Sequence, residues 1–389
     1  MNERILIEKI KNKHHNIYKE DPLVIAFAPG RIEVLGNHTD YNQGMTLSAA
    51  INQGIFFAIS SSNTKSIQIN SINLNESVSF SLSKIKSSSI YPWVDYIKGI
   101  LYYFENEGIK LEGMNCTFYG SIPMGSGLSS SAALEISLLF ALQEYYKSSI
   151  KLVKLAKIAQ LAEQNFAGCQ CGLLDQYSSI FGIKNGLIHI DFKTNKITQI
   201  PIPNDANFLM VNSNAKHELI NSPYNSRRIS CNNAVNELNN LLPKKIKSLA
   251  DISYLDFKKY SKYLTIDSFK RGSHIIDEIE RVKKSISLLD NNKLDNFGKL
   301  LYESHKSSQI NFENSCNELD LIVDIANQYN AKGARLSGGG WGGSVVVLTN
   351  LEDAETLLEK IILKGQNKGL KPTGNIIYPS DGAKIIKDF

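Results

Sequence analysis

The sequence lacks any long uncharged apolar run. Its first 20 residues mix acidic and basic side chains with apolar ones, which predicts an amphipathic helix and excludes a typical secretory signal peptide. The most apolar later run, residues 132–146, is too short to cross a bilayer and carries Glu135 near its start. We therefore expect no membrane partner.

Cysteine is also scarce, with 5 among 389 residues. The number is odd, the spacings are irregular and no secretory signal precedes them, so free thiols in a reducing cytoplasm are expected in place of a disulfide framework. Cys169 and Cys171 have too short a spacer for a zinc knuckle, and no second pair completes one. The sequence therefore predicts structural thiols and a cytoplasmic location.

Charge of one sign is not in clear excess. The net charge is +5 and no basic block stands out, so a nucleic-acid partner is not indicated. A modestly positive surface suits a phosphorylated small substrate. The proportions of hydrophobic (42%) and charged (21%) residues are those of an ordinary globular protein, and the length predicts two domains. A monomer is the favoured oligomeric state.

The order of apolar patterns indicates an α+β protein. Strand-like runs separated by turn residues precede helical stretches in the first half, and mostly helical segments are followed by a β-branched strand in the second. Pro, Asn and Asp cluster at PIPNDANF, residues 201–208, before a new strand. We therefore predict two lobes, residues 1–205 and 206–389.

A glycine- and serine-rich segment, GSIPMGSGLSSSAALE at residues 120–135, leads into an apolar helix. Gly125 and Gly127 allow backbone angles that other residues resist. Because the helix is apolar on nearly every face, we expect it to be buried, with amide groups at its start that have no internal partner. Those donors and the helix dipole suit a polyphosphate. An N-capping serine after a flexible turn explains the segment equally well.

The same segment excludes two common nucleotide motifs. It lacks the lysine that a Walker A loop carries after its glycines, and it does not match the GxGxxG pattern of dinucleotide sites. A second polar segment, APGRIEVLGNHTDYNQG at residues 28–44, lies between two apolar runs, so its side chains are expected to face the interior or a cleft. Paired donors and acceptors of this kind suit a hydroxyl-rich ligand.

Five segments, in order along the chain, resemble the galactokinase branch of the GHMP small-molecule kinases. GRIEVLGNHTDYNQG (residues 30–44) resembles the galactokinase signature, PMGSGLSSSAALE (123–135) the ATP motif, and GARLSGGGWGGSVVVL (333–348) the third motif of the superfamily. Between them, AEQNFAGCQCGLLDQYSSIFG (162–182) and HELINSPYNSRR (217–228) resemble segments specific to galactokinases. The resemblance covers nearly the whole chain.

This resemblance implies a two-lobed fold with mixed β-sheets and helices, and an active site in the cleft between the lobes. The implied reaction is ATP-dependent phosphorylation of D-galactose at its anomeric hydroxyl, which gives galactose 1-phosphate and ADP in galactose catabolism. The implied partners are a small-molecule sugar, ATP and Mg²⁺.

The resemblance also implies residue roles. Asp175 matches the catalytic aspartate beside the anomeric hydroxyl, and Arg31 the arginine near it and the transferred phosphoryl group. Ser131 and Glu163 match the magnesium ligands, in agreement with the preference of Mg²⁺ for hard oxygen atoms. The implied nucleotide-binding residues are Gly125, Ser126, Gly127, Leu128, Ser129, Ser130, Ser131, Trp93 and Ser71. The implied sugar-binding residues are Asn37, His38, Thr39, Asp40, Gly172 and Tyr224.

Several of these residues have simpler explanations. Trp93 is nearly as well explained by a place in the core, and Ser71 by a structural role in a strand. Glu163, without the resemblance, reads as a surface carboxylate of a helix. A structural buried ion pair is the alternative for Arg31 and Asp175.

Arginine beside an aspartate limits the mechanism. It favours the ionised form of the carboxyl group, so Asp175 would be a weak base and early proton abstraction is not expected. Phosphoryl transfer has a loose transition state that asks little of the nucleophile until late. We therefore expect Asp175 to orient the hydroxyl and to take its proton late, while Arg31 and Mg²⁺ stabilise charge on the transferred group.

The sequence departs from the commoner family signature at two neighbouring positions. This chain has Asn37 where an acid is usual and Glu33 where a small amide is usual, so the acid has moved four residues. Asparagine can both donate and accept, which leaves the sugar contact of residue 37 open. A kinase of the same fold for another sugar, such as N-acetylgalactosamine or arabinose, is one alternative. A non-catalytic sensor that binds ATP and sugar is another.

Overall fold

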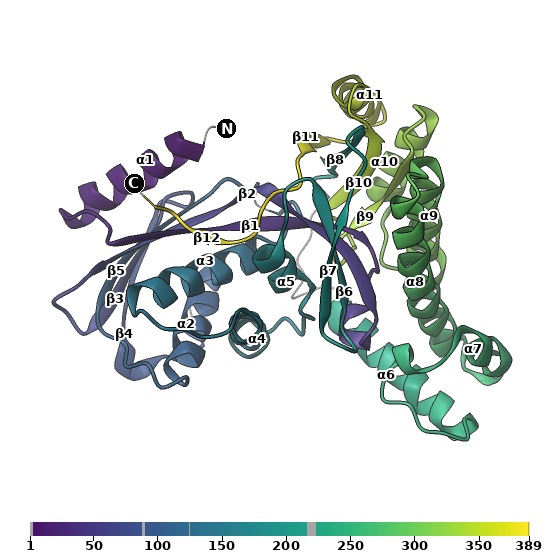
Figure 1. Ribbon diagram of the computed structural model, residues 1–389, viewed down its shortest axis with the longest axis horizontal. Helices are drawn as coiled ribbons and strands as arrows, with labels where there is room; N and C mark the ends of the chain where they lie inside the picture. The colour runs from purple at the N-terminus through teal and green to yellow at the C-terminus, as the bar shows by residue number, and fades with distance from the viewer. Residues whose placement is uncertain (1–2, 88–89, 124, 216–222, 388) are drawn as a thin grey trace.

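The computed structural model describes residues 3–87, 90–123, 125–215, 223–387 and 389. Its helices and strands form two sheets with helices packed against them, and one of the sheets is mixed (Figure 1). The predicted α+β class is therefore confirmed. Within the described part of the chain, every helix is too short or too polar to cross a bilayer.

The larger sheet is built around two long antiparallel strands, β1 (Val24–Leu35) and β2 (Met45–Ser61). All of β1 is buried. The pairing register shifts between Pro29 and Arg31 and again between Glu33 and Leu35. Such irregularities redirect side chains, and here they surround the two charged residues of an otherwise apolar strand.

The other strands of this sheet flank the central pair. One neighbouring pair, β3 and β5, is parallel, which makes the sheet mixed. The last strand returns to pair with β1, so the end of the chain lies beside its beginning (Figure 1). These strands are β3 (Ser66–Ser71), β4 (Glu76–Ser81), β5 (Met114–Gly120), β6 (Gly186–Asp191), β7 (Lys196–Pro201) and β12 (Lys384–Ile385).

Helices cover both faces of the larger sheet (Figure 1). On one face, Leu6 and Ile10 of α1 (Glu3–Tyr18) pack in a cluster with Phe27 and Phe56. The helix α3 lies on the opposite face and is buried along most of its length, as its apolar sequence predicts. The helices of that face are α2 (Pro92–Glu105), α3 (Ser130–Tyr145), α4 (Leu152–Ala162) and α5 (Leu174–Phe181).

The smaller sheet is antiparallel, in the order β11-β8-β10-β9. Along β10, Val345 and Val347 pack in a cluster with α10 and α11, whereas Val346 and Leu348 belong to the core of the larger sheet. The two sheets therefore share a continuous core. The elements are β8 (Ala206–Asn212), β9 (Gly333–Ser337), β10 (Ser344–Asn350), β11 (Thr373–Ile377), α10 (Asn317–Gln328) and α11 (Ala354–Asn367).

Four further helices form the side of the molecule beside both sheets (Figure 1). The longest of them, α8, packs against both α6 and α9, and α9 also contacts β9. They are α6 (Tyr224–Leu241), α7 (Tyr254–Tyr260), α8 (Ile266–Asp290) and α9 (Leu294–Ser307). The predicted lobe boundary at residue 205 falls between β7 and β8 and stays a prediction. The strand β12, which follows this boundary in the sequence, pairs with β1 of the larger sheet.

Candidate active site

A cavity opens where β1, α3 and α5 meet the loop between β9 and β10. Its empty space, open solvent included, is roughly 740 Å³. The predicted site residues that line it are Arg31, Asn37, His38, Asp40, Gly127, Ser129, Ser131, Glu163, Gly172, Asp175 and Tyr224. Of the predicted segment 217–228, residues 217–222 lie outside the described residues.

Arg31 and Asp175 form a two-pronged ion pair in this cavity. Nε of Arg31 donates to Oδ1 of Asp175 at 2.8 Å, and Nη2 donates to Oδ2 at 2.9 Å. The third guanidinium nitrogen, Nη1, donates to the carbonyl oxygen of Gly127 at 2.8 Å. Burial opposes the charge of Arg31, but the carboxylates of Asp175 and Glu33 outweigh it and hold the arginine pKa above its usual value. Arg31 is therefore a fixed positive charge that joins the aspartate to the glycine loop.

Ser129 gives Asp175 a further donor, because its hydroxyl donates to Oδ2. A carboxylate offers about four acceptor positions, so the pair with Arg31 and the bond from Ser129 leave one position, on Oδ1. The side chain of Asp175 is 28% exposed, whereas that of Arg31 is only 6% exposed. The free acceptor position of Asp175 is therefore open to a ligand in the cavity.

The glycine loop has the geometry of an anion site. Gly125, Gly127 and Ser129 all have positive φ angles, at 69°, 71° and 57°. The carbonyl oxygen of Gly127 accepts from Arg31, and that of Leu128 accepts from the Arg31 backbone amide at 3.1 Å. In a trans peptide, the following N–H points the opposite way from the carbonyl. The amides of Leu128 and Ser129 therefore point away from β1.

The start of α3 bears on the two explanations of this loop. Ser129 is the residue before the first helical turn, yet its side chain makes no capping hydrogen bond. Its hydroxyl is directed to Asp175 instead. The amides of the first turn are thus left without a side-chain cap, and an anion is the natural partner for such a helix start.

Glu163 lies across the cavity with a hydroxyl beside it. Its Oε1 accepts from the Ser131 hydroxyl at 3.3 Å, and its Oε2 accepts from Nε2 of Gln176 at 3.0 Å. Burial, and then the negative charge of Asp175, raise the pKa of Glu163 to about 7. Glu163 begins a π-helical turn, Glu163–Ala167, a distortion that often marks functional positions. A carboxylate and a hydroxyl that face a cavity suit a hard cation that completes its shell with phosphate oxygens and water.

A further acid lies behind this pair. Glu135 of α3 is fully buried, and burial raises its pKa well above the usual value. The charge of Glu163 is the second cause of this rise. The apolar run around Glu135 signalled a buried helix but gave no sign that this acid would lie next to Glu163.

The opposite wall carries the predicted sugar residues. Asp40 lies so close to Gly172 that a Cβ atom at residue 172 would stand 1.7 Å from Oδ2, so this approach requires glycine. Burial raises the pKa of Asp40 to about 7. Burial also lowers the pKa of His38 to about 4, and both of its ring nitrogens are bonded, to Tyr41 and to the carbonyl oxygen of Gly339. His38 is therefore a neutral part of the wall and not an acid or base.

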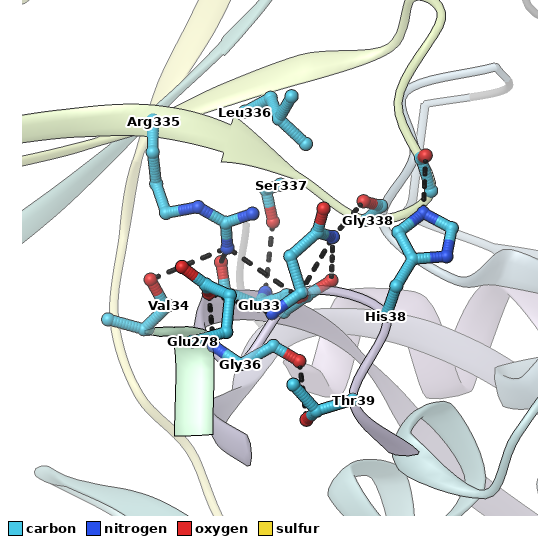
Figure 2. A network of polar contacts seen from close by, with 12 residues as sticks. Glu33, Val34, Gly36, His38, Thr39, Glu278, Arg335, Leu336, Ser337 and Gly338 are labelled. Atoms are coloured by element: carbon cyan, nitrogen blue, oxygen red, sulfur yellow. Dashed lines mark hydrogen bonds and ion pairs between the residues drawn. The ribbon is translucent and has the colours of Figure 1, made fainter. Parts of the chain in front are cut away.

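Glu33 also lines the cavity, although the sequence analysis did not assign it to the site. Nδ2 of Asn37 donates to its carboxylate, and Arg335 of β9 lies 3.6 Å from Oε1. Figure 2 shows the guanidinium of Arg335 and the hydroxyl of Ser337 directed from β9 toward Glu33 and its neighbours on β1. These contacts join residues about 300 positions apart in the sequence, so no local pattern could have indicated them.

Other predicted residues do not line the cavity. The hydroxyl of Thr39 is bonded to carbonyl oxygens of its own loop, and that of Ser126 to the carbonyl oxygen of Pro123. Trp93 and Ser71 lie together at Phe118, away from the lining. The predicted residues outside the lining are Thr39, Gly125, Ser126, Leu128, Ser130, Trp93 and Ser71. Their assignments stay predictions.

Three family models match the chain. The galactokinase galactose-binding signature matches residues 12–61, the N-terminal domain of the GHMP kinases matches residues 95–183, and the C-terminal domain of the GHMP kinases matches residues 285–367. The matched regions contain Arg31 and Glu33, the glycine loop and Glu163, and the loop between β9 and β10.

Curated relatives cover nearly the same length. The chain is 36% identical over 362 residues to the galactokinase of Thermotoga petrophila, covering 92% of this chain and 99% of the relative. It is 34% identical over 368 residues to the galactokinase of Glaesserella parasuis, covering 92% of this chain and 94% of the relative.

Solved structures share the fold. The crystal structure of Lactococcus lactis galactokinase complexed with galactose superimposes with a TM-score of 0.92 at 26% identity, covering 97% of this chain and 99% of that one. A mevalonate kinase superimposes with a TM-score of 0.61 at 22% identity, covering 92% of this chain and all of the other, and this likeness shows the fold alone.

Proposed function

This chain belongs to the galactokinase family of the GHMP kinases and is a sugar kinase, and from that premise we propose that it phosphorylates D-galactose at the anomeric hydroxyl. The family resemblance of the sequence motifs is confirmed. ATP is the phosphoryl donor of the family, and the products would be galactose 1-phosphate and ADP.

One observation carries the proposal. The ion pair between Arg31 and Asp175, with its bonds of 2.8 and 2.9 Å, lies between the glycine loop and the wall formed by Asp40 and Gly172. A phosphoryl group held by the loop and a sugar hydroxyl held by the wall would therefore meet at this pair. Proximity of this kind supplies much of the catalysis in phosphoryl transfer.

The reaction follows from this arrangement. The oxygen of the anomeric hydroxyl forms a bond to the γ-phosphorus, the bond from that phosphorus to the β,γ-bridging oxygen breaks, and ADP leaves with the electron pair. The proton of the hydroxyl passes to Asp175 late in the reaction, because the loose transition state of phosphoryl transfer asks little of the nucleophile until late. Arg31 stabilises the charge that develops on the transferred group.

The structure's oxygen atoms fit a magnesium ion. Ser131 and Glu163 would hold it, because their hydroxyl and carboxylate are 3.3 Å apart at the cavity wall and Mg²⁺ takes hard oxygen ligands. When bound, the ion would neutralise phosphate charge. Ser131 and Glu163 would in turn orient the nucleotide relative to Asp175.

The remaining expectations concern the setting of the enzyme. We propose a cytoplasmic monomer whose partners are the sugar and ATP, with no nucleic acid and no membrane partner. The active site would lie in the cleft between two lobes divided near residue 205.

An ADP-release assay with a panel of sugars, with and without Mg²⁺, tests the function. Activity confined to galactose and dependent on Mg²⁺ is the expected result. Activity with N-acetylgalactosamine or arabinose in place of galactose would assign another sugar to the same fold. Binding of sugar and ATP without any ADP release would contradict catalysis and support a sensor.

A further inference from the structure

The two positions at which this chain departs from the commoner family signature lie in direct contact. Nδ2 of Asn37 donates to Oε1 of Glu33 at 3.1 Å and to Oε2 at 3.3 Å. Both side chains are buried, and both line the cavity. The acid and the amide therefore form one pair in the wall of the site.

The partners of Asn37 explain why its position now holds an amide. Its Nδ2 donates to the carbonyl oxygen of Gly338 at 2.8 Å as well as to Glu33, and its Oδ1 accepts from Nδ2 of Asn314 at 2.9 Å. An acid at position 37 would face the carbonyl oxygen of Gly338 and the carboxylate of Glu33 with no hydrogen to give. With an acid at 33, position 37 therefore suits an amide and not a second acid.

Glu33 retains capacity to accept hydrogen bonds. Among the described residues, the hydrogen bonds to its carboxylate come from Nδ2 of Asn37, which donates to both oxygens. These two distances, 3.1 and 3.3 Å, are longer than the 2.8 Å from the same nitrogen to the carbonyl oxygen of Gly338. Arg335 balances the charge of Glu33 from the side of β9, at 3.6 Å from Oε1 (Figure 2). A carboxylate offers about four acceptor positions, so at least one on Oε2 is not used by Asn37.

Building on the proposed function, we propose that Glu33 is a substrate-binding residue whose carboxylate accepts a hydrogen bond from one hydroxyl group of the sugar. The pair of Glu33 and Asn37 then selects sugars that carry this hydroxyl. Bonds from a hydroxyl to a carboxylate are short and strong, and a buried acceptor left unpaired is costly. A site built in this way rejects the analogue that lacks the hydroxyl.

The test measures binding of galactose and of its single-deoxy analogues to the wild-type protein and to Glu33→Gln by calorimetry. We expect Glu33→Gln to weaken galactose binding by about 10- to 100-fold, the usual range for one hydrogen bond to a charged group. For one deoxy analogue, the one that lacks the hydroxyl in question, the two proteins should bind equally. Glu280→Gln, which removes an exposed acid of α8, is the matched control and should bind galactose as the wild type does.

Two results would overturn the proposal. Equal weakening for galactose and for every deoxy analogue would show that Glu33 only supports the wall, and unchanged galactose binding would show that it has no part in recognition. Phosphorylation of each sugar provides a second measurement, in which the loss should fall on KM more than on kcat.

An exchange variant gives an independent test. Asn37→Glu alone should lose galactose binding, because two acids would face each other. Glu33→Asn combined with Asn37→Glu removes that repulsion and should recover part of the binding, since the carbonyl oxygen of Gly338 still faces an acid. Failure of the double variant to bind better than Asn37→Glu, when both melt at the wild-type temperature, would contradict the pairing. If the wild type takes another sugar of the panel in place of galactose, the proposed function is wrong, and the same deoxy scan on that sugar still tests Glu33.

Discussion

The two ends of the cavity hold their acids in opposite ways. Asp175 is bound by the guanidinium of Arg31 at two points, whereas Glu163, among the described residues, accepts hydrogen bonds from the neutral groups of Ser131, Cys171 and Gln176. The Asp175 end is therefore complete, in the sense that Arg31 balances the charge of its acid within the protein. At the other, burial raises the pKa of Glu163 to about 7, so near neutral pH this carboxyl group is only partly ionised in the protein alone. The comparison indicates which end a metal ion would complete.

Removing the charge of Asp175, at the complete end of the cavity, should have the largest effect on activity. Asp175→Asn keeps the shape of the side chain but removes the group that takes the proton, so we expect kcat to fall by about 10³-fold. Sugar binding measured by calorimetry should change only modestly. Ser129→Ala, which removes the other donor to Asp175 but leaves the arginine, should cost much less. Near-normal turnover in Asp175→Asn would refute the assignment of this end.

Removing the charge of Glu163, at the other end of the cavity, should raise the concentration of magnesium that the enzyme requires. Glu163→Gln should raise the Mg²⁺ concentration needed for half-maximal activity by about 10-fold or more, because a ligand has lost its charge. The Mg²⁺ dependence of ATP binding, measured by calorimetry, should shift in the same direction. Glu135→Gln is a matched control, since it alters a neighbouring buried acid that lies outside the cavity lining. An unchanged Mg²⁺ dependence in Glu163→Gln would place the ion elsewhere.

The sugar wall should respond to pH in the physiological range. Burial raises the pKa of Asp40 to about 7, and the charges of Glu33 and Asp175 add to this rise. Because a protonated carboxyl group accepts fewer hydrogen bonds, sugar affinity should fall several-fold, by up to about ten, as the pH drops from 7 to 6. Calorimetry with sugar alone checks this, and Asp40→Asn should bind weakly with little dependence on pH. Constant affinity of the wild type from pH 6 to 8 would contradict it.

The smallest expected effect concerns stability. In the folded protein Glu135 holds its proton well above pH 4.5, whereas the unfolded chain releases it near that pH. The free energy of unfolding must then decrease as the pH rises from 4.5 toward the folded pKa, at about 1.4 kcal/mol per pH unit. Glu135→Gln should make this decrease shallower and raise stability at pH 8 by at least about 1 kcal/mol, without a change in kcat. Urea unfolding between pH 5 and 8 measures it, and an equally steep decrease in the variant would contradict it.

Local patterns were enough to find the segments that build the site. Glycine and serine before an apolar helix, and polar residues between two apolar runs, are signals that short stretches of sequence carry. The cavity indeed brings Arg31, Asp175 and Gly127 together. The α+β class could be predicted for the same reason, because hydrophobic periodicity is local.

The contacts that give the site its electrostatics could not be predicted in this way. Asn37 meets Asn314 across 277 residues, and Arg335 reaches the carbonyl oxygen of Glu33 across 302. The hydroxyl of Ser129 donates to Asp175, and the backbone of Ser129 is left-handed. Serine rarely adopts this conformation, and the neighbouring residues in the sequence do not predict it. Tertiary packing, and not the local sequence, sets each of these contacts.

The return of β12 to the edge of β1 also bears on how the chain is made. Ala26 pairs with Ile385, which lies 359 residues further along the chain, so during synthesis this edge of β1 stays uncovered until that later segment has left the ribosome. Until then its backbone is an open edge at which nascent chains can associate.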